Sequence, residues 1–65
     1  MKLRINGETE DISPGAGVMD LLRARGQEGE VAVAVNGAFV PRNSYDEVAL
    51  KEGDEVEIVA PMQGG

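Results

Sequence analysis

The final two residues, Gly64 and Gly65, are the clearest candidates for a chemical role in this 65-residue sequence. An α-carboxylate carried on residues without side chains fits a passage too narrow for any Cβ atom, and glycine adopts backbone torsions that other residues rarely accept. The carboxylate is an anion at neutral pH, so it is a poor electrophile until a leaving group such as adenylate replaces its charge. This terminus predicts a substrate or carrier on which other enzymes act. The alternative is a frayed chain end without a role.

Composition excludes several classes of site and partner. The sequence has no cysteine and no histidine, so we expect no disulfide and no metal site. Because the terminus predicts a substrate or carrier, we also expect no catalytic residues. Twelve acidic and six basic residues leave a net charge of −6, which disfavours nucleic acid and favours protein partners with basic surfaces, although such a charge can also serve solubility alone. The alternating start of the chain is typical of neither a signal peptide nor a membrane span, and predicts a cytoplasmic protein without membrane contact.

The first twelve residues predict a β-hairpin. Leu3 and Ile5 alternate with charged residues over Lys2–Asn6, which is the pattern of a half-buried strand. Asn6-Gly7 favours a two-residue turn, so Glu8–Ile12 should return antiparallel to the first strand. Because this second segment is acidic and a poor strand former, we expect it at the margin of the sheet.

One short helix is predicted over Val18–Arg25. Val18, Leu21 and Leu22 form a single apolar stripe, with Gly17 before it as N-cap and Gly26 after it as C-cap. A helix of this length needs its leucine stripe packed on the sheet. We interpret Met19 as a filler at the edge of that packing.

The second half predicts a further hairpin and a closing strand. Val31–Val35 places three valines on one face, and Asn36-Gly37 should turn the chain into the short strand Ala38–Val40. The segment Asn43–Leu50 is ambiguous; its apolar residues should anchor the connection, with room for a helical turn. Glu55–Ala60 should close the sheet. Its apolar Val56 and Ile58 point inward and Glu55, Glu57 and Val59 point outward, before Pro61 ends the strand.

Together these elements predict an α+β roll in which two hairpins flank one crossover helix. For the first and last strands to share the core, they should lie side by side and parallel at the sheet centre. We therefore expect one domain over residues 1–60 and an extended, flexible tail over residues 61–65.

The ordered motifs of the sequence resemble the ThiS family of sulfur carriers in thiamine biosynthesis. The resemblance covers nearly the whole chain and is carried by Leu3–Gly7, Val18–Leu22, Val33–Gly37, Val40–Arg42, Leu50–Val59 and Pro61–Gly65. It implies a ubiquitin-like β-grasp fold: a mixed sheet of four to five strands, one main helix on one face, and an extended C-terminal tail.

The resemblance also implies a sequence of reactions at the tail. An E1-like adenylyltransferase, similar to ThiF, would use ATP and magnesium to join AMP to the Gly65 carboxylate. Sulfur from a cysteine desulfurase relay would then displace AMP, and the resulting thiocarboxylate would supply a thiazole synthase similar to ThiG. Gly64, Gln63 and Met62 would pass into the partner enzyme. The chain itself would bind no cofactor and would be a monomer when alone.

Three further residues are candidates for docking a partner. Val59 and Phe39, together with Met62, would form an apolar patch if they are exposed, and Arg42 would pair either with a local carboxylate or with a partner. Alternative functions stay open: sulfur donation to molybdopterin or tRNA, conjugation to lysines as a ubiquitin-like modifier, or a plain interaction module.

Overall fold

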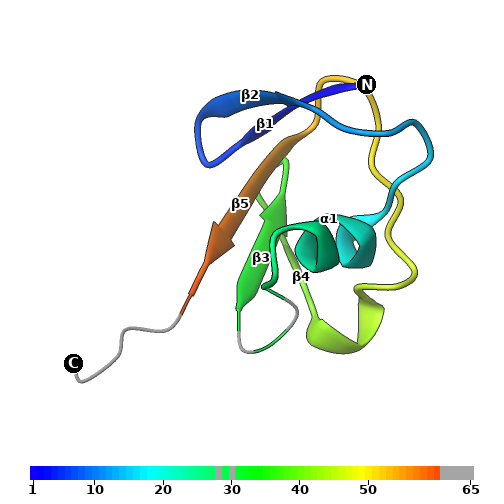
Figure 1. Cartoon of the computed structure of the whole chain (residues 1–65). Helices are drawn as coiled ribbons and strands as arrows, with labels where there is room; N and C mark the ends of the chain where they lie inside the picture. The colour runs from blue at the N-terminus through cyan, green and yellow to red at the C-terminus, as the bar shows by residue number, and fades with distance from the viewer. Residues whose placement is uncertain (28, 30, 61–65) are drawn as a thin grey trace.

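The structure, a computed structural model, describes residues 1–27, 29 and 31–60. In chain order the elements are β1 (Lys2–Ile5), β2 (Glu8–Asp11), α1 (Val18–Ala24), β3 (Ala32–Val35), β4 (Ala38–Val40), the 3-10 turn η1 (Arg42–Ser44) and β5 (Glu55–Val59). The strands form one sheet in the order β2-β1-β5-β3-β4. Helix α1 lies against one face of this sheet (Figure 1). This is the predicted β-grasp architecture.

Both hairpins turn at the predicted Asn-Gly pairs. Asn6 and Asn36 have φ angles of 53° and 52°, and the glycines that follow have φ of 86° and 82°. Positive φ at both central residues defines the turn whose twist matches a two-residue hairpin. Antiparallel pairing of β1 with β2 and of β3 with β4 follows.

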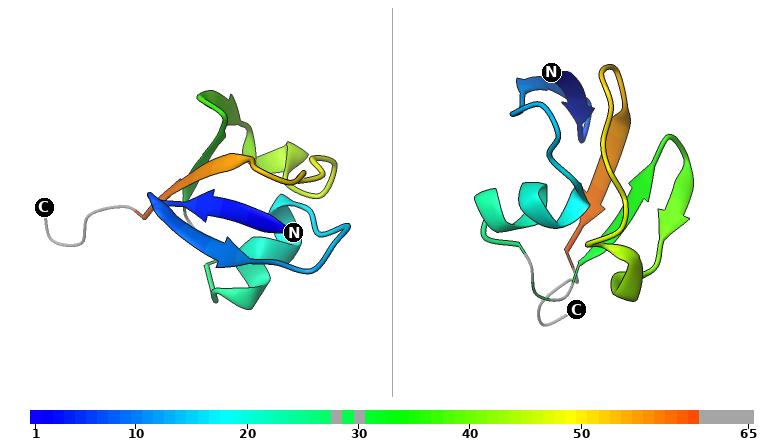
Figure 2. Two further views of the ribbon diagram at one scale, coloured as in Figure 1. Left: turned by 90° about the horizontal axis from the view of Figure 1, so that it is seen from above. Right: turned by 90° about the vertical axis from the view of Figure 1, so that its right-hand side faces the viewer.

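Strand β5 lies at the centre of the sheet, where the sequence places it. It runs parallel to β1, with Ile5 opposite Val56, and antiparallel to β3, with Val33 opposite Ile58. Figure 2 shows β5 between these two strands from above. The acidic strand β2 occupies one margin of the sheet, which confirms that prediction as well.

The core fills the space between α1 and the inner face of the sheet. It contains the predicted inward residues of strands and helix together with two from the connection before β5: Leu3, Ile5, Val18, Leu21, Leu22, Val33, Val40, Tyr45, Leu50, Val56 and Ile58. The Tyr45 hydroxyl donates to the Val31 carbonyl at 2.8 Å, so the aromatic ring is buried with its polar atom satisfied. The segment 43–50 is therefore anchored as predicted, with η1 as its helical turn.

Element ends differ slightly from the predicted ones. Helix α1 stops at Ala24 with Arg25 as its C-cap, and Ile12, Val31 and Ala60 lie just outside their strands. The Val31 carbonyl bonds the Tyr45 side chain, while β3 pairs with β5 from Ala32 onward. Tertiary contacts thus make β3 begin at Ala32, one residue later than the alternating pattern predicts.

Gly17 begins α1 and also allows a close backbone approach. Its N–H donates to the Asp20 carboxylate at 2.9 Å, which satisfies one of the free amides of the first turn. A Cβ atom at Gly17 would lie 2.8 Å from the Val48 carbonyl oxygen, which accepts the Val18 N–H at 3.0 Å. The helix start is therefore joined directly to the segment that leads into β5.

Candidate functional site

The predicted site residues Met62, Gln63, Gly64 and Gly65 lie outside the described residues, as does Pro61. The tail 61–65 and its separation from residues 1–60 therefore stay predictions. The structure does describe the strand that leads to this segment. Strand β5 runs through the sheet centre and its C-terminal end points away from α1 (Figure 1). The base of the candidate site is therefore the central strand of the sheet, which pairs with a neighbour on each side.

Two asparagine side chains hold β5 from both sides. The Asn6 amide oxygen accepts the Ile58 N–H at 2.8 Å, and its amide nitrogen donates to the Ile58 carbonyl at 3.3 Å. On the other side the Asn36 amide oxygen accepts the Glu55 N–H at 2.9 Å. Both residues are the first positions of the Asn-Gly turns, so each turn fixes the central strand as well as its own hairpin.

Asp54 secures the beginning of β5. Its carboxylate accepts from the Asn36 amide nitrogen at 2.9 Å and from the Lys51 N–H at 2.8 Å, and the residue is almost fully buried. The Asn36 hydrogen bond, helped by the Lys51 backbone bond and charge, lowers the pKa of Asp54 below its usual 3.8, although burial acts in the opposite direction. Sequence reasoning assigned Asp54 only to a turn, because its partner Asn36 lies far along the chain.

The sheet face opposite α1 carries an apolar hollow. Phe39, Ala34 and Glu57 lie in one row across β4, β3 and β5, and Ala32 lies opposite Val59 in the next row. Phe39 is 69% exposed and Val59 is 63% exposed, in contrast to the buried residues on the inner face. The hollow between these rows is lined by Ala32, Val33, Ala34, Phe39, Glu57 and Val59. Both described members of the predicted apolar patch are therefore brought together.

A second, more polar hollow adjoins the first on the same face. It is lined by Arg4, Gly7, Gly37, Glu55, Val56 and Glu57. The glycines belong to the two Asn-Gly turns on either side of β5, and the Arg4 Nε atom lies 3.7 Å from a carboxylate oxygen of Glu55. Glu57 lines both hollows and so marks their junction.

Arg42 does not line either of these hollows. It lies in η1, and its guanidinium donates to the Gly29 carbonyl at 2.6 Å. This contact ties η1 to the connection before β3. The contact that the structure describes for Arg42 is to a backbone carbonyl, and its pairing with a carboxylate or with a partner protein stays a prediction.

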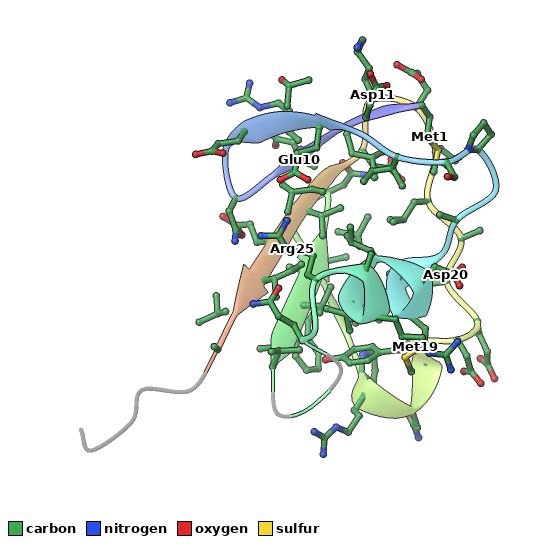
Figure 3. All side chains as sticks on the ribbon, in the orientation of Figure 1. Met1, Glu10, Asp11, Met19, Asp20 and Arg25 are labelled. Atoms are coloured by element: carbon green, nitrogen blue, oxygen red, sulfur yellow. The ribbon has the colours of Figure 1, made fainter. Side chains whose placement is uncertain are left out.

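A third hollow separates the margin of the sheet from α1. Its lining includes Ile12, Ala16, Leu21 and Ala24. Nearby, the Arg25 guanidinium lies 3.1 Å from the Glu10 carboxylate, joining the end of α1 to β2 (Figure 3). Met19 lies on the other side of α1, partly buried against the core, which confirms its interpretation as a packing residue.

The described residues contain no cluster of three or more acidic, cysteine or histidine side chains that could hold a metal ion. Within the same part of the chain, no helix is long and apolar enough to cross a membrane. The described part of the candidate site is therefore the central strand β5, held by side-chain hydrogen bonds, together with the exposed sheet face opposite α1.

Comparison with known proteins places the chain in a family. The ThiS family model matches residues 3–65. A crystal structure of a thiamine biosynthesis protein (ThiS) from Geobacter metallireducens superimposes with a TM-score of 0.85 at 33% identity, over the full length of both chains. A solution structure of a thiamine biosynthesis protein from the same organism gives 0.83 at 36% identity, covering all of this chain and 88% of the other.

Two longer relatives share the same segment. A thiazole synthase of Paramagnetospirillum magneticum is 46% identical over 66 residues, and one of Magnetococcus marinus is 39% identical. Each match covers all of this chain but only 20% of the relative, so the chain spans about a fifth of their length. With the match over residues 3–65 and the fold in agreement, the chain belongs to the ThiS family.

Proposed function

We propose that this protein is a sulfur carrier of thiamine biosynthesis whose Gly65 carboxylate is converted to a thiocarboxylate. The observation that carries the proposal is the family match, which extends through residue 65 and so includes the diglycine. The likeness to a thiamine biosynthesis protein over its whole length supports the pathway. The chain is then a substrate of other enzymes and not a catalyst.

The proposed chemistry has two steps, and both involve the carboxyl group of Gly65. In an E1-like adenylyltransferase that binds ATP and magnesium, a Gly65 carboxylate oxygen attacks the α-phosphorus of ATP. The bond between the α- and β-phosphates breaks, so AMP stays joined to the carboxyl group and pyrophosphate leaves. A sulfur nucleophile at the oxidation level of sulfide, derived from a cysteine desulfurase relay, then attacks the acyl carbon and expels AMP. The product is a thiocarboxylate, whose sulfur is a better nucleophile than the oxygen it replaces.

The chain's own residues contribute positioning. Asn6 and Asn36 fix β5 at Ile58 and at Glu55, so the direction in which the chain leaves the sheet is set by hydrogen bonds. Gly64, Gln63 and Met62 follow as the segment that enters the partner. The exposed side chains of Phe39 and Val59 beside this exit form the docking face.

The partner that receives the sulfur is a thiazole synthase. Two relatives named thiazole synthase contain the segment matched by this entire chain, which is a reason to prefer thiazole formation over molybdopterin or tRNA thiolation and over lysine conjugation.

Intact mass measurement tests the proposal. The protein is incubated with an E1-like adenylyltransferase of the ThiF type, ATP, magnesium and sulfide, and we expect a mass gain equal to one oxygen-to-sulfur exchange. A reaction without ATP should leave the mass unchanged. If the mass also stays unchanged with ATP, under conditions in which a known carrier is converted, the proposed function is wrong.

A further inference from the structure

Glu57 stands at the junction of the two hollows on the outer sheet face. It lies opposite Ala34 in the pairing of β5 with β3, and Phe39 lies opposite Ala34 on the far side. The apolar hollow and the polar hollow both count Glu57 among their lining residues. An exposed carboxylate therefore borders an apolar surface at the centre of the face.

Among the residues that the structure describes, Glu57 forms no ion pair. The ion pairs among the described residues join Lys2 to Asp11, Arg4 to Glu55 and Arg25 to Glu10. The residues outside the described part are two glutamates and Pro61–Gly65, none of which carries a positive side chain. Glu55, two residues earlier on the same strand, faces Arg4, so the two outward carboxylates of β5 differ in this respect.

The polar hollow has room for a side chain from another molecule. Gly7 and Gly37 frame it, and a Cβ atom built on either glycine would meet no atom within 4 Å. Both glycines have positive φ, so the turns that form the hairpins also keep side chains away from this space. A long cationic side chain entering here would reach Glu57 beside the Arg4–Glu55 pair.

We propose that Glu57 selects the protein partner by pairing with an arginine or lysine of the thiazole synthase, while an apolar side chain of the same enzyme fills the hollow between Phe39 and Val59. This inference rests on the proposed function for the identity of the partner. Docking covers the carboxylate with apolar surface, so a partner without a cation would leave a charge desolvated and unpaired. Complementary charge thus favours the correct enzyme and penalises others.

The test compares Glu57→Gln with Glu47→Gln in binding to thiazole synthase by calorimetry at low and high salt. Both residues are exposed and both changes remove one negative charge, but Glu47 does not line the described hollows. We expect Glu57→Gln to weaken binding about tenfold or more, with a smaller salt dependence. The dissociation constant of Glu47→Gln should lie within about twofold of that of the unchanged protein, as expected for a charge outside the interface.

A charge reversal provides the second arm. Glu57→Arg should weaken binding more than Glu57→Gln, and exchanging the opposing cation of the thiazole synthase for glutamate should restore part of the loss. Equal affinities for Glu57→Gln, Glu47→Gln and the unchanged protein would overturn the role of Glu57 and leave the proposed function standing. If the unchanged protein binds no thiazole synthase, the acceptor in the proposed function is wrong and this inference falls with it.

Discussion

Among the single residues that the structure describes, Asp54 is the titratable group whose pKa the fold clearly changes. The Asn36 hydrogen bond lowers that pKa in the folded state, so the native protein binds a proton at Asp54 less readily than the unfolded chain does. The resulting stabilisation is fully present above the ordinary pKa of 3.8 and is lost as pH falls through the lower folded value. At neutral pH the interaction is complete.

Asp54→Asn should therefore destabilise the protein at pH 7 and matter less in acid. The variant places an amide nitrogen next to that of Asn36 or gives up the Lys51 N–H, and we expect a loss of about 1–2 kcal/mol in the free energy of unfolding. Denaturant unfolding of both proteins from pH 7 to pH 2.5 measures the difference. A difference in the free energy of unfolding that stays the same below pH 3 as at pH 7 would contradict the assigned role of the ionised carboxylate.

At the scale of elements, the two Asn-Gly turns act on β5 as well as on their own hairpins. Asn6→Gly keeps a residue that tolerates positive φ but removes both side-chain bonds to Ile58, so we expect a loss of about 1–2 kcal/mol and faster hydrogen exchange of the Ile58 amide. Asn36→Gly is the comparison variant, because it should release Asp54 and Glu55 at the other end of the strand. Faster exchange at the same amides in both variants would argue against separate anchors.

The sequence predicts these elements well where local chemistry decides them. Asn-Gly turns, the Leu21-Leu22 stripe and the alternation around Val56 depend on near neighbours, and all of them are confirmed. The exposure of Phe39 is harder to predict, because a strand of three residues is too short for an alternating pattern to show which face is outer. The pairing of Phe39 opposite Ala34 places it on the outer face. Asp54 could not be found from sequence, since its burial depends on a turn far from it in the chain.

In the whole molecule, the described core and the residue proposed to react occupy different stretches of the chain. Within the described part of the chain, every core residue lies between Leu3 and Ile58, and the last ladder pair of β5 joins Val59 to Ala32. The two proposed roles also belong to different parts of the chain. We propose that the outer face around Glu57 selects the partner and that Gly65 receives the sulfur, and Glu57 lies outside the core.

Deleting Gly65 should consequently separate stability from function. The truncated protein keeps every core and strand contact, so its thermal midpoint should stay within about 2 °C of the full chain, because a change well below 1 kcal/mol shifts the midpoint of a small domain by only a few degrees. Sulfur loading by the adenylyltransferase, followed by intact mass, should be lost, since the terminal carboxylate is one residue short of the active site. Binding of thiazole synthase through the Glu57 face should weaken far less than loading. A truncated protein that still loads sulfur at the normal rate would refute the assignment to Gly65, and a large fall in the thermal midpoint would place the terminus within the fold.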